Sequence, residues 1–325
     1  MKRSLSGIQP SGVLHIGNYF GAIKQFVELQ NEYEGFYFLA NYHALTSSPK
    51  GEDLKNNTIN VILDYLALGL DPEKSTLFLQ SDVPEHTELS WILSNVTPMG
   101  LLERAHSYKD KTAKGIKPNV GLFTYPVLMA SDILIYSPDI VPVGKDQKQH
   151  VEITRDIAIK FNETYGKEIF KLPEEKIVEN VATVPGIDGD KMSKSYGNVI
   201  NMFGSKKQLK KQIMSIVTDS TPLEEPKNPD NNITKLYSLF ATEEEVNTLK
   251  EKFLAGNFGY GHAKTELFDK FMDYFAPFQK KREELLQNMD YVNEILKKGA
   301  LKAREIATKK VDEVRDVVGI MKKSY

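Results

Sequence analysis

Cysteine is absent from all 325 residues of the chain, which excludes disulfides and thiolate metal sites. No apolar run near the N-terminus has the length of a signal peptide, and no stretch approaches the roughly 20 apolar residues that cross a membrane. The chain also lacks a large excess of charge of one sign, because its 42 Lys and Arg nearly balance its 44 Asp and Glu. We expect a cytoplasmic, globular protein in which any site for a polyanion is local.

Apolar runs alternate with helical patterns over the first 185 residues. Strands are expected at residues 4–8, 35–41, 76–81 and 139–144, and helices at 18–30, 53–69 and 86–96. Such alternation predicts an α/β fold with a doubly wound parallel sheet. Sheets of this kind bind ligands at the carboxyl ends of their strands, so the site is expected there.

The pattern after Asn201 is helical throughout. Helices are expected at residues 205–217, 232–240, 243–254, 261–288 and 290–319, with no strand between them. The sequence therefore predicts a sheet domain over 1–190, a loop and linker over 191–204, and an all-helical domain over 205–325. The last helix is a candidate for packing back on the sheet domain.

The first motif of interest follows the first expected strand, which should end at Ile8. A turn at residues 9–12 leads to His15-Ile16-Gly17-Asn18, which opens a helix. A glycine at this position lets a phosphate approach the backbone N–H groups at the positive end of the helix dipole. Taken alone, the motif is more often an ordinary loop between a strand and a helix.

The second motif, GDKMSKSYGN, covers residues 189–198 and places Lys191 and Lys194 three residues apart in a loop with no apolar run to bury it. Alone it also suits a solvated basic loop. Together, in this order, the two motifs resemble the HIGH and KMSKS signatures of class I aminoacyl-tRNA synthetases. KMSKS is present without a mismatch, while Asn18 replaces the second histidine of HIGH.

This resemblance implies a Rossmann fold on which the two motifs flank ATP. Lys191, Lys194 and Gln9 are then the catalytic candidates. The ammonium groups of the two lysines stabilise the charge that develops on the leaving pyrophosphate. Mg2+ would share the phosphate charge, without a permanent metal or cofactor, and a backbone group within 182–184 would contact adenine. The implied ATP-binding residues are Gln9, Pro10, Ser11, His15, Gly17, Asn18, Gly144, Lys145, Asp146, Lys191, Met192, Ser193, Lys194 and Ser195.

A third stretch, residues 121–158, bears on the amino acid. Helical spacing places Tyr125, Met129, Asp132 and Tyr136 on one stripe. A carboxylate there is costly unless it has a donor, or unless it lies at a solvent edge or caps a neighbouring helix. The stretch resembles the tryptophanyl-tRNA synthetase family, in which the matching aspartate accepts the indole N–H. We expect a buried Asp132 to be left unpaired without that donor.

The same resemblance implies a tryptophan pocket. His43 is equally explained as a structural hydrogen bonder, and Leu5 stands where some relatives place an aromatic residue. The implied tryptophan-binding residues are Asp132, Tyr125, Met129, Gln147, His43, Ile133, Val141 and Val143.

The activity implied is ATP-dependent ligation of L-tryptophan to its tRNA through tryptophanyl-adenylate, in a homodimer whose helical domain binds the anticodon. Two lysine groups are candidate tRNA contacts, although both also suit a solvated surface: Lys206, Lys207, Lys210 and Lys211, and Lys109, Lys111, Lys114 and Lys117. One alternative is an enzyme similar to tyrosyl-tRNA synthetase, which typically carries glutamine where this chain has Met129. The other is a non-catalytic synthetase paralogue, which usually loses part of either motif.

Overall fold

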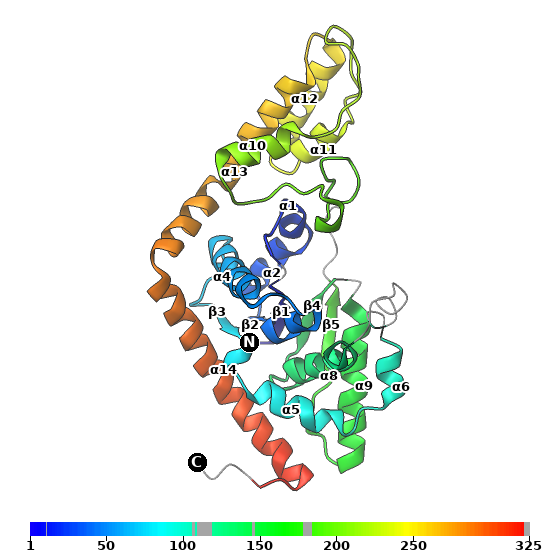
Figure 1. The fold of residues 1–325 in the computed structure, drawn as a ribbon, viewed down its shortest axis with the longest axis vertical. Coiled ribbons are helices and arrows are strands. Elements are labelled where there is room, and N and C mark those ends of the chain that lie inside the picture. The colour runs from blue at the N-terminus through cyan, green and yellow to red at the C-terminus, as the bar shows by residue number, and fades with distance from the viewer. Residues whose placement is uncertain (11, 106–107, 109–118, 145–146, 178–183, 322–325) are drawn as a thin grey trace.

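In the computed structural model, a parallel sheet forms the centre of the N-terminal part of the chain (Figure 1). The structure describes residues 1–10, 12–105, 108, 119–144, 147–177 and 184–321. Within them the strands are β1 Arg3–Ile8, β2 Glu34–Leu39, β3 Ser75–Leu79, β4 Ile140–Val143 and β5 Glu174–Ile177. Their order is β3-β2-β1-β4-β5, and every pairing is parallel. The predicted doubly wound α/β fold is confirmed.

The observed strands differ from the predicted ones in two respects. β2 and β3 end two residues earlier than predicted, at Leu39 and Leu79, because short helical turns begin directly after them. β5 was not predicted, since its sequence EEKI has no apolar run and lies at the edge of the sheet.

Helices cover both faces of the sheet. Alternate residues of β2 show this directly: Tyr37 and Leu39 join the core cluster that includes α4, whereas Phe36 and Phe38 join the cluster that includes α8 and α9. The helices of this part are α1 Ile16–Asn18, α2 Lys24–Glu28, α3 Asn41–Ala44, α4 Gly51–Ala67, α5 Glu85–Ser94, α6 Met99–Glu103, α8 Val120–Leu134 and α9 Lys148–Tyr165.

The remaining described helices extend from one end of the sheet domain and return along its side (Figure 1). They are α10 Lys206–Met214, α11 Asn232–Tyr237, α12 Glu243–Ala255, α13 Tyr260–Gln287 and α14 Met289–Val318. None of the helices in the described ranges is long and apolar enough to cross a membrane. One core cluster contains residues of both parts, so the boundaries at 190 and 205 stay predictions.

The C-terminal helix α14 lies against the edge strand β3. A Cβ atom on Gly299 would come within 1.9 Å of the carbonyl oxygen of Leu77, so this close approach requires glycine. Ala303 and Ala307 of α14 are fully buried in the same cluster as α5 and α8. The helix thereby covers the exposed backbone of an edge strand.

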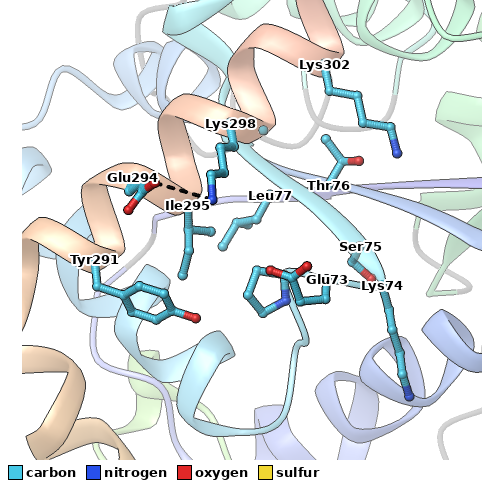
Figure 2. A pocket seen from close by; sticks show the side chains of 12 residues that line it. Glu73, Lys74, Ser75, Thr76, Leu77, Tyr291, Glu294, Ile295, Lys298 and Lys302 are labelled. Carbon is cyan, nitrogen blue, oxygen red and sulfur yellow. Dashed lines mark ion pairs between the residues drawn. The ribbon is translucent and has the colours of Figure 1, made fainter.

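A hollow of about 210 Å3 lies between α14 and the beginning of β3 (Figure 2). Ser75, the first residue of β3, lines it, so it is at the amino end of the parallel sheet. Lys298 on its rim faces Glu294 at 3.3 Å. No residue predicted to bind a substrate lines this hollow, and the candidate active site lies elsewhere.

Candidate active site

A larger cavity, of about 520 Å3, lies at the carboxyl ends of the central strands. Gln9 follows β1, Ala40 follows β2 and Gly144 follows β4, and all three line it. This is the end of the sheet at which ligands were expected. The lining includes every residue predicted for tryptophan: His43, Tyr125, Met129, Asp132, Ile133, Val141, Val143 and Gln147.

Much of the cavity wall is apolar. Leu5 forms part of it and is almost fully buried, and Phe26 and Phe38 contribute aromatic surface. Neither phenylalanine was predicted from the sequence to line a site. The alternation of β2 indicates that Phe38 faces the same side as Phe36, but it does not indicate which face of the sheet bears the cavity.

Among the described residues that line the cavity, Asp132 is the one carboxylate, and it is fully buried. Its Oδ2 lies 2.7 Å from Nε2 of His43, and its Oδ1 lies 2.6 Å from Nδ1 of His86. Gln80 donates from Nε2 to both oxygens at 2.9 Å. The prediction that Asp132 would be unpaired without a ligand is therefore wrong, and a solvent-edge position is excluded.

The charge state of Asp132 follows from these partners. Burial alone would raise its pKa, but the hydrogen bonds from His43 and His86 outweigh burial and lower the pKa below its usual value. The carboxylate is thus ionised at neutral pH. His86 and Gln80 were not predicted, because they precede Asp132 by 46 and 52 residues and no local pattern links them to it.

Two further features of the lining depart from the predicted helical stripe. α8 ends at Leu134, so Tyr136 lies beyond the helix, where its hydroxyl contacts His86 behind the cavity wall. The hydroxyl of Tyr125 hydrogen-bonds to Nε2 of His150, a lining residue of α9 that was also missed. His150 follows Gln147 by three residues, a helical spacing that could have identified it.

The two sequence motifs meet at the turn after β1. Ile16 donates its backbone N–H to the carbonyl of Ile200 at 3.0 Å. A Cβ atom on Gly17 would lie 2.9 Å from Nδ1 of His15 and 3.2 Å from Cβ of Met192, so glycine permits this contact. A Cβ on Gly12 would lie 3.7 Å from Nζ of Lys194. The ammonium group of Lys194 therefore lies beside the turn, with His15 close by.

The KMSKS loop is anchored in spite of its polar sequence. Met192 is buried, and its N–H donates to the carbonyl of Val184 at 2.9 Å. Asn198 accepts from the N–H of Ser193 at 2.8 Å and donates to Asp188 at 2.9 Å. This leaves the side chains of Lys191 and Ser195 exposed, while Met192 serves as an anchor.

The positions of the other predicted residues say less about their roles. Pro10 is buried at the turn, and Asn18 accepts the N–H of His15 at 3.1 Å. Some of the predicted site residues and positions lie outside the described ranges: Ser11, Lys145, Asp146, Lys109, Lys111, Lys114, Lys117 and positions 182–183.

Comparison with known proteins agrees with the site. The family model described as tRNA synthetases class I (W and Y) matches residues 2–276. The chain belongs to this family.

The synthetase is 68% identical over 325 residues to a tryptophan–tRNA ligase of Fusobacterium nucleatum, with both chains fully covered. It is 54% identical to that of Rhodopirellula baltica, covering 98% of this chain and 99% of the relative. A crystal structure of tryptophanyl-tRNA synthetase from Campylobacter jejuni, complexed with ADP and tryptophan, superimposes with a TM-score of 0.94 at 56% identity. That match covers 98% of this chain and 100% of the relative.

The environment of His15 generates a prediction about pH. Burial and the nearby charge of Lys194 lower the pKa of His15 from 6.5 to about 4. Between these values the unfolded chain binds a proton at this position and the folded chain does not, so acidification favours unfolding. Urea unfolding at pH 7 and pH 5 should show a smaller loss of stability for His15→Asn than for the native chain. Equal losses in both proteins would contradict the assignment.

Proposed function

We propose that this synthetase ligates L-tryptophan to its tRNA in two steps. A carboxylate oxygen of tryptophan attacks the α-phosphorus of ATP, and the P–O bond to pyrophosphate breaks. A terminal ribose hydroxyl of the tRNA then attacks the carbonyl carbon of the adenylate, and AMP leaves. The names of the closely similar ligases support this reaction, and the buried, ionised Asp132 in a mainly apolar cavity is the observation that carries the choice of amino acid.

The tryptophan side chain fits the polarity of this cavity. Met129, Val141 and Phe38 offer apolar surface to an indole, and Asp132 accepts the ring N–H. Tyr125 and Gln147 line the same cavity and are proposed to contact the α-ammonium group. Ile133, Val143 and His43 complete the wall around the ring.

ATP is proposed to bind from the turn after β1 to the KMSKS loop. Gln9 and Pro10 follow β1, and His15, Gly17 and Asn18 lie at the start of the next helix. Lys191 to Ser195 are proposed to contact ATP from the KMSKS loop, and Ser11, which is outside the described residues, is proposed to join them. Gly144 follows β4 and is proposed to contact ATP, together with Lys145 and Asp146, which lie outside the described residues. Mg2+ enters with the phosphates, and the whole reaction is placed in the cytoplasm. The position of Lys194 Nζ, 3.7 Å from where a Cβ atom on Gly12 would lie, supports this arrangement, as does ADP in the Campylobacter relative.

The alternatives have less support. A tyrosyl-tRNA synthetase of Archaeoglobus fulgidus shares the fold at only 19% identity, whereas the relatives above 50% are tryptophan–tRNA ligases. A non-catalytic paralogue is disfavoured because His15, Lys191 and Lys194 are all present.

Asp132 is the basis of a specificity prediction. Wild type should prefer tryptophan over its benzothiophene analogue, which has sulfur in place of N–H, by about 10- to 100-fold in kcat/KM for pyrophosphate exchange. A hydrogen bond to a charged group has this magnitude, and the loss is limited because Asp132 keeps its protein donors. Asp132→Ala should lose most of the preference. Equal kcat/KM for both substrates in wild type would exclude Asp132 as the reader of the indole N–H.

The KMSKS lysines are expected to act mainly on the transition state. Lys191→Ala and Lys194→Ala should each lower the adenylation rate by about 10²- to 10³-fold, with a smaller rise in the KM for ATP. Lys207→Ala, which changes an exposed lysine of α10, serves as the control. A raised KM with unchanged kcat would mean that Lys191 and Lys194 only bind ATP in the ground state.

A basic surface on α10 is proposed to contact tRNA phosphates. Its members are exposed and occupy neighbouring turns: Lys206, Lys207, Lys210 and Lys211. Replacing all of them with glutamine should weaken tRNA binding and make its dependence on salt less steep, because fewer counterions are released. An unchanged slope in a plot of log Kd against log salt would remove α10 from the tRNA footprint.

A homodimer is proposed through an exposed apolar face. Trp91, Leu45 and Val120 line one shallow hollow and are 73%, 52% and 78% exposed, respectively. Such large apolar side chains gathered on one surface typically mark an interface. Light scattering should give twice the chain mass of 36.8 kDa, and the double variant Trp91→Glu, Val120→Glu should give the monomer. A monomeric, active wild type would contradict the dimer.

A further inference from the structure

Behind the wall of the tryptophan cavity, Asp132 belongs to a chain of fully buried polar groups. Nδ1 of His86 lies 2.6 Å from Oδ1 of Asp132, and Nε2 of His86 lies 2.7 Å from the hydroxyl of Tyr136. Both His86 and Tyr136 are 0% exposed, and neither lines the cavity. These two residues therefore do not touch a substrate in the cavity.

Donors and acceptors in this chain can be assigned from Asp132. An ionised carboxylate only accepts, so Nδ1 of His86 carries the hydrogen. If the imidazole is neutral, Nε2 accepts and the hydroxyl of Tyr136 is the donor. Burial, followed by the charges of Asp132 and Glu85, raises the pKa of Tyr136, which keeps that hydroxyl protonated. In this tautomer the order of donation is Tyr136 to His86 to Asp132.

The residues of this hydrogen-bonded series are each fixed by a further contact. Ser131 donates its hydroxyl to the carbonyl of His86 at 2.6 Å, and the Arg3 guanidinium donates to the carbonyl of Tyr136 at 2.6 Å. The ring of Tyr136 stacks on Phe36 at a centroid distance of 5.4 Å. His86 and Tyr136 therefore have little freedom to move away from Asp132.

Gln80 restrains the carboxylate from another direction. Its Oε1 accepts the N–H of Tyr42 at 3.0 Å, which orients the amide so that Nε2 donates to both oxygens of Asp132. His43, which does line the cavity, contacts Oδ2, whereas His86 contacts Oδ1 from behind. Oδ2 is accordingly the oxygen on the cavity side.

The N-terminal turn of α5, which carries His86, is itself held by the C-terminal helix. Glu85 is buried beside His86 and accepts from the guanidinium of Arg304 on α14 at 2.9 Å. Arg315 of α14 pairs with Glu88 one turn further along α5. The position of His86 thus depends on contacts with α14 as well as on its own hydrogen bonds.

We propose that His86, supported by Tyr136, is a positioning residue for specificity. It occupies Oδ1, holds the plane of the carboxylate and aims Oδ2 at the ring N–H of an aromatic amino acid. This inference rests on the proposed function, because it needs Asp132 to read the indole N–H. Groups outside the cavity then contribute to the preference for a ring that carries an N–H donor over a ring of the same shape that lacks one.

The test compares three variants in pyrophosphate exchange with tryptophan and its benzothiophene analogue. His86→Leu removes the donor, His86→Asn keeps an N–H near the place of Nδ1, and Tyr136→Phe removes only the hydroxyl. Loss of a buried hydrogen bond to a carboxylate should lower the preference for tryptophan by about 10-fold or more in His86→Leu, mainly through the KM for tryptophan. His86→Asn should stay within about 3-fold of wild type, and Tyr136→Phe should lie between them.

Thermal unfolding separates positioning from loss of structure. Tyr65→Phe is the matched control, because Tyr65 is a buried tyrosine whose side chain packs in the other core cluster. The inference is overturned if a folded His86→Leu retains the full preference for tryptophan. If His86→Leu does not fold, Tyr136→Phe decides, and a preference equal to that of Tyr65→Phe overturns the inference. A wild type without any preference instead refutes the proposed role of Asp132 itself.

Discussion

The burial of an ionised carboxylate at Asp132 is the constraint on which the arrangement of the site depends. A charge in a mainly apolar cavity is stable only with several donors around it. His43, Gln80 and His86 supply them, each from a different element after β2 or β3. These donors meet only if β2 and β3 are neighbours in parallel register, as they are. The stability of the buried Asp132 carboxylate therefore depends on the topology of the sheet.

The helices extend this dependence to distant parts of the chain. α14 packs on β3 and fixes the start of α5 through Glu85, next to His86. α13 packs on α4, and its Arg282 pairs with the buried Asp64 at 2.6 Å. The charge of Asp64 in turn acts on Lys194 of the KMSKS loop. Burial lowers the pKa of Lys194, and the charge of Asp64 partly offsets this shift. The KMSKS loop and the surroundings of Asp132 are thus each connected to a long C-terminal helix.

Local patterns were sufficient to predict the alternation of strands and helices, since apolar period and turn residues report it directly. They also placed Tyr125, Met129 and Asp132 on one face of α8, which the cavity confirms. β5 was not predicted, because an edge strand can be polar. Three contacts were not predicted, because each joins segments that are far apart in the sequence: those of His86 and Gln80 with Asp132, and that of Gly299 with Leu77. The roles of individual residues came from resemblance to a family, and stay proposals here.

A crystal structure of the protein with L-tryptophan bound would test the central claim most directly. We expect the indole nitrogen to lie about 2.7–3.2 Å from Oδ2 of Asp132, while His86 remains hydrogen-bonded to Oδ1. An indole nitrogen directed away from Asp132, toward Met129 or Val141 with the ring otherwise seated in the cavity, would contradict it.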